Sequence, residues 1–89
     1  MAARENHLEI ATELLRAAKA EGAGAIELVE ALRERLGDLS TIMFVASFGG
    51  AFGISVKVLM EAHTWQGFHG PGPLHLTDEQ FVALLARWV

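Results

Sequence analysis

One uncharged stretch in the middle of the chain constrains the fold more than any other feature. Residues 39–56 have the sequence LSTIMFVASFGGAFGISV and contain no charged side chain. A membrane-spanning helix needs about 20 predominantly apolar residues, so this length nearly suffices. The stretch nevertheless contains three serines, a threonine and three glycines, and no cluster of Lys or Arg flanks it to set an orientation in a bilayer. The sequence therefore favours a buried core segment over a membrane span.

The charged side chains are concentrated in the first part of the chain. Residues 1–38 contain thirteen Asp, Glu, Lys and Arg residues, whereas residues 39–89 contain five. A small single domain buries only about 60–65% of the surface of its unfolded chain, so the apolar second part must leave some apolar surface exposed. Such surface is typical of a contact with another protein chain. The sequence predicts a protein-interaction module that self-associates or docks on a partner.

The overall composition argues against several other classes of protein. The net charge of −4 disfavours nucleic-acid binding, because such proteins need clustered Lys and Arg side chains to neutralise phosphates. The chain has no Cys, which excludes disulfides and thiolate metal ligands and is typical of the reducing cytosol. The N-terminal segment mixes charged with apolar residues and lacks the continuous apolar run of a signal peptide. We therefore expect a cytoplasmic protein that needs no cofactor and does not insert into a membrane.

Two amphipathic helices are predicted before the uncharged stretch. Asn6, with Glu9 three residues later, can cap the first helix, and Gly37 can adopt the left-handed conformation that ends the second. The short connection at 22–24 then predicts an antiparallel helical hairpin. The apolar residues expected to pack are Leu8, Ala11, Leu14, Leu15 and Ala18 in the first helix, and Ile26, Val29, Leu32 and Leu36 in the second.

The uncharged stretch predicts either one bent helix or two separate helices. Asp38 or Ser40 can cap its start. Gly49 and Gly50 each cost about 1 kcal/mol relative to Ala inside a helix, so we expect a break there. Ser55 can cap a following helix over 56–63. The expected packing residues are Ile42, Val45 and Phe48, with Phe44 as a further candidate, and Val58, Leu59 and Ala62 after the break.

The last part of the chain is predicted to be a loop followed by a helix. Residues 65–76, WQGFHGPGPLHL, contain three glycines and two prolines that oppose regular structure. Thr77 can cap the final helix, and Gln80 three residues later completes a capping box. The packing face of that helix is expected to consist of Phe81, Leu84, Leu85 and Trp88. The predicted fold class is all-α, a single domain over 1–89 folded as a compact bundle of four or five helices.

No arrangement of residues predicts an enzyme. The serines and threonines lack the preceding strand of a nucleophile elbow, and the GGAFG segment at 49–53 lacks the Lys and Ser/Thr of a phosphate-binding loop. His63, His69 and His75 are spaced six residues apart, but this spacing matches no zinc-finger or HExxH pattern. Whether they converge on a metal ion or lie scattered in solvent stays open. No catalytic, cofactor-binding or metal-binding residue is predicted.

One segment suggests a kind of interaction module. Residues 11–38, ATELLRAAKAEGAGAIELVEALRERLGD, combine Leu-Leu, Gly and Glu-Leu-Val at the spacing of a helical hairpin. This hairpin resembles the opening of the small helical effector-associated and death-like adaptor domains of bacterial conflict and signalling proteins. The resemblance implies a noncatalytic module that joins like modules through helix faces, and it assigns no specific binding residues to this chain.

The aromatic residues near the C-terminus are the candidates for the interface. Tryptophan anchors often dominate binding energy at protein interfaces, although large aromatic side chains also build cores. A symmetric homodimer is the expected state, because two-fold pairs are the commonest outcome of self-association. The alternative is a small stand-alone inhibitor or immunity-type protein that blocks a target by binding it. The predicted contact surface consists of Trp65, Phe68, Phe81, Leu84 and Trp88.

Overall fold

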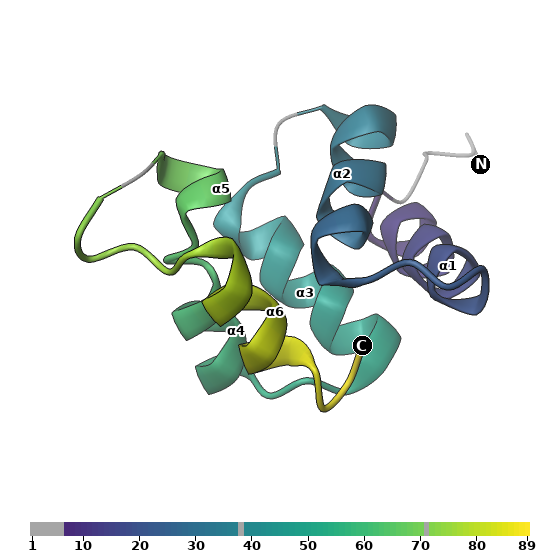
Figure 1. The fold of residues 1–89 in the computed structure, drawn as a ribbon. Coiled ribbons are helices and arrows are strands. Elements are labelled where there is room, and N and C mark those ends of the chain that lie inside the picture. Colours follow the sequence, from purple (N-terminus) through teal and green to yellow (C-terminus); the bar gives the residue numbers. More distant parts are fainter. Residues whose placement is uncertain (1–6, 38, 71) are drawn as a thin grey trace.

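The chain folds as an all-α protein. The structure, a computed structural model, describes residues 7–37, 39–70 and 72–89. These ranges contain no strand, and their one β-type pairing is an isolated bridge between Trp65 and Leu76. The predicted all-α bundle is confirmed, with one single-turn helix, α5, in addition to the larger ones. The helices labelled in Figure 1 are α1 (His7–Ala20), α2 (Ala25–Leu36), α3 (Thr41–Phe52), α4 (Val56–Ala62), α5 (Gln66–His69) and α6 (Asp78–Leu85).

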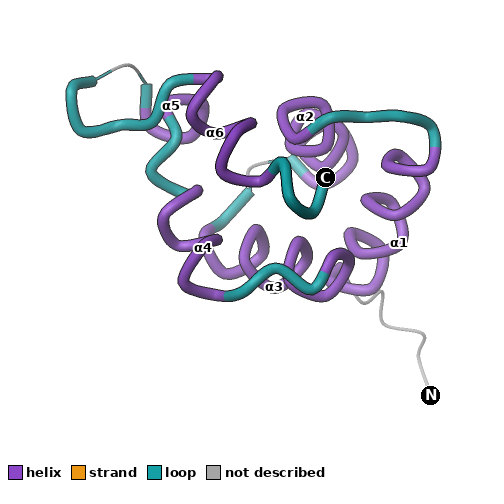
Figure 2. The backbone as a smooth tube through the Cα atoms, turned by 60° about the horizontal axis from the view of Figure 1, so that its bottom comes forward, coloured by secondary structure: helices purple, strands orange, loops and turns teal. Residues whose placement is uncertain are grey.

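Five of these helices form a closed ring around the core. α1 packs against α2 and α3, α4 packs against α3 and α6, and α6 closes the ring by packing against α2. Figure 2 shows α3 along one side of the molecule, with α2 and α6 opposite it and α1 at one end. α5 and its loop lie at the end farthest from α1. Each helix of the ring therefore turns one face inward.

The core is built from aromatic and aliphatic side chains of all five ring helices. Phe44 and Phe48, one turn apart on α3, place their ring centroids 4.7 Å apart at its centre. Burying each large apolar side chain stabilises the fold by about 1.5–3 kcal/mol. No helix in the described ranges is both long enough and apolar enough to cross a membrane. Completely buried side chains include Leu15, Leu28, Val29, Leu32, Phe44, Phe48, Leu59, Phe81 and Leu85.

The two helices before the uncharged stretch form where predicted, but they are not antiparallel. Ala11 and Leu15 of α1 are buried, and so are Val29 and Leu32 of α2. Figures 1 and 2 show α1 crossing α2 steeply, because α1 also packs against α3. The prediction of an antiparallel hairpin is therefore wrong. The predicted cap Asn6 lies outside the described residues.

The ends of α2 are satisfied by local hydrogen bonds. The Gly24 N–H donates to Glu27 Oε1 at 2.8 Å, which pairs a donor at the start of the helix. The Gly37 N–H donates to Arg33 O at 2.9 Å and ends the helix. Its φ of 81° is positive, as predicted, but its ψ of −139° lies outside the left-handed helical region. Leu28, which the predicted apolar stripe omits, is completely buried.

The uncharged stretch contains all of α3 and ends at Val56, the first residue of α4. α3 continues through Gly49 and Gly50 and ends at Gly53, whose φ of 71° and ψ of 23° are left-handed. The predicted break at Gly49 and Gly50 is therefore wrong, and the break lies three residues later. Arg16 Nη2 of α1 donates to Gly50 O at 3.1 Å, so the adjacent helix also holds this turn of α3 in place.

The inward face of α3 differs from the predicted one. Phe44, Ser47 and Phe48 are buried, whereas 81% of the surface of Ile42 is accessible to solvent. Ile42 precedes Phe44 by two residues, which places it about 200° away around the helix. The prediction of Ile42 as a packing residue is therefore wrong, because the two phenylalanines take the inward face. On α4, the predicted packing residues Leu59 and Ala62 are buried.

The predicted helix caps Ser40, Ser55 and Thr77 are present, whereas Asp38, the alternative cap of the uncharged stretch, lies outside the described residues. Ser40 Oγ accepts a hydrogen bond from Met43 N at 3.1 Å at the start of α3, and Ser55 caps α4 in the same way. Thr77 and Gln80 form the predicted capping box of α6, because each side chain accepts a hydrogen bond from the other residue's backbone N–H. These contacts fix where three helices begin.

The segment between α4 and α6 is a loop whose two ends are held together. Gln66 N donates to Leu76 O at 2.9 Å, and Leu76 N donates to Thr64 O at 3.0 Å. Between these ends, residues 66–69 form the single helical turn α5. No regular structure was predicted here, so this turn is a correction to the sequence-based expectation. Gly67 permits this turn, because a side chain there would overlap the six-membered ring of Trp65.

Candidate functional site

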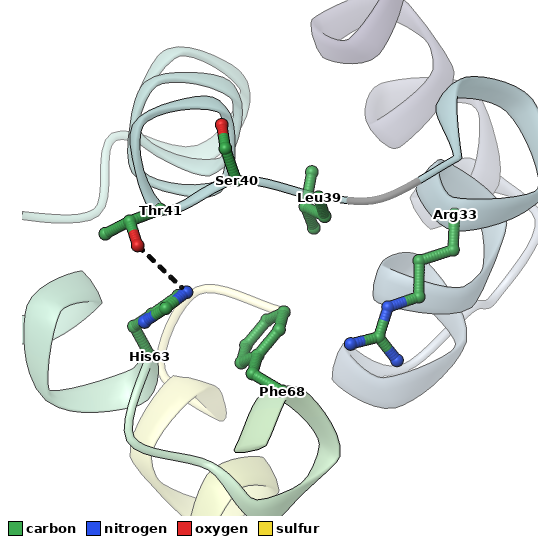
Figure 3. Close-up of a pocket in the computed structure, with 6 residues that line it drawn as sticks. All are labelled: Arg33, Leu39, Ser40, Thr41, His63 and Phe68. Atoms are coloured by element: carbon green, nitrogen blue, oxygen red, sulfur yellow. Dashed lines mark hydrogen bonds between the residues drawn. The ribbon is translucent and has the colours of Figure 1, made fainter.

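A polar cavity opens at the N-terminus of α3 and is walled by four helices and the segment before α3. Its volume is about 360 Å³. Arg33 reaches it from α2, His63 from the C-terminal end of α4 and Phe68 from α5. Figure 3 shows these side chains arranged below the segment that leads into α3. The lining residues are Arg33, Leu39, Ser40, Thr41, His63 and Phe68.

Phe68 lines the cavity, and its ring lies between the side chains of His63 and Arg33. Its ring stacks on the His63 imidazole, with centroids 4.7 Å apart and planes tilted by 19°. The Arg33 guanidinium carbon lies 5.1 Å from the centroid of the same ring. Arg33 Nη2 also donates to Gly67 O at 2.7 Å. Figure 3 shows Phe68 between His63 and Arg33, so the three side chains form one layered stack.

His63, one of the three side chains of this stack, has a shifted pKa. Its Nε2 lies 3.2 Å from Thr41 Oγ1 and shares a hydrogen bond with that hydroxyl. Burial, and to a lesser extent repulsion from His69, lowers the pKa of His63 below its ordinary value of 6.5. This shift favours the neutral form of the imidazole.

The rings of the three histidines lie close to one another along the segment from 63 to 75. The His63 and His69 ring centroids are 5.0 Å apart, and those of His69 and His75 are 5.2 Å apart. His69 Nε2 donates to His63 O and His75 Nδ1 donates to Gly70 O, both at 2.8 Å. Among the described residues, no group of three or more His, Cys, Asp or Glu side chains could hold a metal ion.

Two of the five predicted interface residues belong to the core. Trp65 and Phe81 stack with centroids 4.2 Å apart and planes tilted by 13°, and both side chains are buried. Trp65 Nε1 donates to Asp78 Oδ1 at 2.9 Å, which pairs the indole N–H. A partner cannot contact these two rings in the folded chain, so they are core residues and not surface residues.

The other three predicted interface residues are half-buried. Phe68 is covered by His63 and Arg33 in the stack described above. Leu84 lines a shallow hollow between α4 and α6, together with Leu76. The Arg87 guanidinium carbon lies 5.9 Å from the ring centroid of Trp88. None of these three side chains is fully buried, so the prediction that Phe68, Leu84 and Trp88 contact a partner stays a prediction.

The largest exposed apolar side chains near α3 and α4 were missed by the sequence prediction. Ile42 on α3 is 81% exposed, and Val56 and Met60 on α4 are 63% and 52% exposed. The signal was present, because Val56 and Met60 are four residues apart on one helix face. A hollow of about 350 Å³ lies beside them and is lined by Thr41, Ile42, Val45, Ala46 and Met60.

The serines considered as nucleophiles all have structural hydrogen bonds. Ser47 is completely buried, and its hydroxyl donates to Met43 O at 2.6 Å within α3. Ser40 and Ser55 are helix caps. Comparisons of the chain with protein-family models, with curated proteins and with solved structures find no match. Two surface features of the described residues are the candidates for function: the polar cavity and the apolar hollow.

Proposed function

We propose that this chain is a noncatalytic protein-interaction module that pairs with a second copy of itself through α3 and α4. The observation that carries the proposal is the exposure of Ile42, Val56 and Met60 on two adjoining helices. Clustered apolar side chains on a small protein mark an interaction surface more often than isolated ones do. We call the surface formed by Ile42, Val45, Ala46, Val56 and Met60 the α3–α4 face.

The hollow in the α3–α4 face supports a contact with a protruding side chain. Its lining consists of the aliphatic residues of that face together with Thr41. An apolar side chain that enters it removes apolar surface from water, which contributes about 25 cal/mol for each Å² buried. In a two-fold pair the same face lies on both subunits, so Ile42 of each copy can reach the hollow of the other.

Charge complementarity favours a second copy of the chain as the occupant. Lys57 and Glu61 follow Val56 and Met60 in the sequence, so they lie one turn apart beside the apolar pair on α4. When two copies of α4 pair in opposite directions, Lys57 of one copy meets Glu61 of the other. The two-fold axis repeats this contact, which gives two pairs of opposite charge at the edge of the apolar contact.

The proposed function agrees with the kind of module that the sequence of residues 11–38 resembles, although α1 and α2 do not form the antiparallel hairpin expected there (Figures 1 and 2). Effector-associated and death-like adaptor domains join like modules through helix faces, and self-pairing through the α3–α4 face would be such a contact. Binding of this kind requires no cofactor and no catalytic residue. The proposal differs from the sequence prediction in its location. The α3–α4 face contains none of the five predicted interface residues, two of which, Trp65 and Phe81, are buried.

Light scattering of two matched variants tests the proposed contact. We expect the wild-type chain to have the mass of a dimer at micromolar concentrations and Ile42→Lys to be a monomer with unchanged helical content. The control is Leu74→Lys, because Leu74 is 88% exposed but lies in the loop after α5. It should remain a dimer. A monomeric wild type, or equal dissociation in both variants, would contradict the proposal.

A further inference from the structure

The helices α3 and α4 are connected through residues 53–55 at one end, and a side-chain hydrogen bond connects them at the other. Thr41 is the first residue of α3, His63 directly follows α4, and Thr41 Oγ1 lies 3.2 Å from His63 Nε2. Figure 3 shows this contact between the start of α3 and the end of α4. We infer that this bond sets the separation of the two helices, so that pairing of two copies through the α3–α4 face is coupled to the protonation of His63. The inference rests on the proposed function, because it concerns the regulation of the same face.

Thr41 connects the imidazole to the hollow that a second copy would enter. It lines the polar cavity together with His63, and it also lines the hollow of the α3–α4 face. The other residues around that hollow belong to α3, except Met60, which belongs to α4. A change in the separation of the two helices at Thr41 therefore changes the width of the hollow.

The imidazole of His63 is held in surroundings that suit its neutral form. The rings of Phe68 and Phe44, with centroids 4.7 Å and 5.9 Å from that of His63, take the place of water on parts of its surface. Burial, and to a lesser extent His69, lowers the pKa of His63. A protonated ring is therefore more stable where water can reach it, away from its contact with Thr41.

The charged groups around the imidazole act in the same direction. The ring centroid of His69, on α5, lies 5.0 Å from that of His63, and Arg33 of α2 lies across the stacked phenyl ring. Of the acidic side chains on the adjoining helices, Glu61 of α4 lines the hollow between α4 and α6, and Asp78 of α6 accepts hydrogen bonds from the start of the loop. A positive charge on His63 is therefore placed beside His69 and, across the phenyl ring, beside Arg33.

The sign of the coupling follows from the form of His63 that the paired chain favours. Two copies pair when the hollow has its present width, which requires the contact between Thr41 and the neutral imidazole. Protonation draws the ring away from Thr41, so the protonated chain pairs less tightly. Pairing in turn lowers the affinity of His63 for a proton, because coupling between two binding equilibria is reciprocal. The dissociation constant of the dimer therefore rises as the pH falls through the pKa of His63.

Sedimentation at several concentrations, repeated between about pH 8 and about pH 5.5, measures this coupling. We expect the dissociation constant of the wild type to rise about fivefold or more over this range. The rise should be lost in His63→Gln and also in Thr41→Val, which keeps His63 and the shape of residue 41 but removes the hydroxyl. The matched control is His75→Gln, because His75 belongs to the same segment but bonds to Gly70 O and lines neither the cavity nor the hollow. It should keep the wild-type profile, and circular dichroism checks the folding of each variant at each pH.

A second measurement needs no substitution at the hydrogen bond itself. In the Ile42→Lys chain, the methyl chemical shifts of Val45 and Met60 should titrate with the same midpoint as the His63 ring. This inference alone is overturned if the wild-type dimer has the same dissociation constant at every pH, if His63→Gln or Thr41→Val keeps the wild-type profile, or if the methyl shifts do not follow His63. A wild type that is monomeric at every pH overturns the proposed function and this inference together.

Discussion

Gly50 and Gly53 are three residues apart, yet only one of them has a backbone conformation that favours glycine. Gly50 lies inside α3, and a methyl group added to it would lie 3.6 Å from Thr12 Oγ1, an ordinary contact distance. Gly53 ends the helix with a φ of 71°, and no atom lies within 4 Å of an added methyl group. Space therefore permits alanine at both positions, and the backbone decides the difference between them.

We predict opposite effects of alanine at these two glycines. Gly50→Ala should raise the free energy of unfolding by about 1 kcal/mol, because alanine has the higher helix propensity. Gly53→Ala should lower it by about 1–2 kcal/mol, because the left-handed conformation brings Cβ close to the following carbonyl oxygen. Urea unfolding followed by circular dichroism measures both values. A destabilising Gly50→Ala would show that the contact between α1 and α3 is closer than described above.

His63 makes the stability of the fold depend on pH. Its folded pKa is lowered by burial and by His69, so the unfolded chain, with an ordinary value of 6.5, takes up the proton first as the pH falls. The stabilising contribution is fully present above pH 6.5 and is lost as the pH falls from there toward the folded pKa. The groups around the imidazole are His69 on α5, Thr41 on α3 and, across Phe68, Arg33 on α2.

We predict that His63→Gln flattens this pH dependence. The wild-type free energy of unfolding should decrease more steeply than that of the variant between about pH 7 and about pH 5, because only the wild type carries this imidazole. His7→Gln, which removes an exposed imidazole at the start of α1, is the control for the loss of a histidine elsewhere on the surface. NMR titration of the His63 ring gives the direct measurement. A measured pKa of His63 at or above 6.5 would contradict the proposed lowering of this pKa by burial.

At the level of the elements, the Asp78 carboxylate connects the start of the loop between α4 and α6 to α6 itself. Asp78 Oδ1 accepts from Trp65 Nε1 at 2.9 Å and from Gln66 Nε2 at 3.2 Å. The Trp65 ring is buried against Phe81, so the indole N–H needs this partner. The start of α6 and the start of the loop are therefore held by the same side chain.

We predict that Asp78→Ala destabilises the fold by about 1–3 kcal/mol more than Glu79→Ala, because only Asp78 pairs a buried donor. The control is matched, since both residues are exposed acidic side chains in the first turn of α6 and interact equally with its dipole. Tryptophan fluorescence during urea unfolding reports the difference. Equal effects of the two substitutions would indicate that the hydrogen bond to Trp65 contributes nothing.

The elements with local signals could be predicted from the sequence, and the arrangement of the uncharged stretch could not. Ser40, Ser55 and Thr77 cap helices through contacts three residues away, so sequence spacing alone identifies them. α3 has no charged residue to mark its outer face, and for this reason Ile42 could not be separated from Phe44 as a packing residue. The position of its end depended on which glycine took the left-handed conformation.

The candidate sites were even less accessible to sequence reasoning. The polar cavity joins Arg33 of α2, Thr41 of α3 and His63, the residue that follows α4. These side chains meet only because α2, α4 and α5 surround the start of α3. The histidine spacing left open whether the three rings approach one another or lie scattered in solvent. Their approach depends on the turn α5 and on hydrogen bonds to backbone oxygens, which no spacing rule describes.

At the scale of the whole molecule, the ring of helices separates a buried apolar core from exposed apolar side chains, several of which lie on the α3–α4 face. Trp65 and Phe81 complete the inside, whereas Ile42, Val56 and Met60 point outward. We predict that Lys57→Glu weakens the proposed dimer, because it places two acidic side chains opposite each other, and that adding Glu61→Lys restores it. Sedimentation at several concentrations measures the dissociation constant of the dimer for the single and the double variant. If the double variant dissociates as much as the single one, the opposed pairing of α4 is wrong.

The paired ends of the loop also determine where the chain can be enlarged. Because Gln66 and Thr64 both bond to Leu76, the chain leaves the body and returns to it at one place. A longer tip would cost little free energy, since closing a loop becomes only slightly harder as residues are added. Leu74, in this loop, is 88% exposed and lines neither the polar cavity nor the hollow of the α3–α4 face. A peptide or label inserted beside it should therefore leave the fold of the protein unchanged.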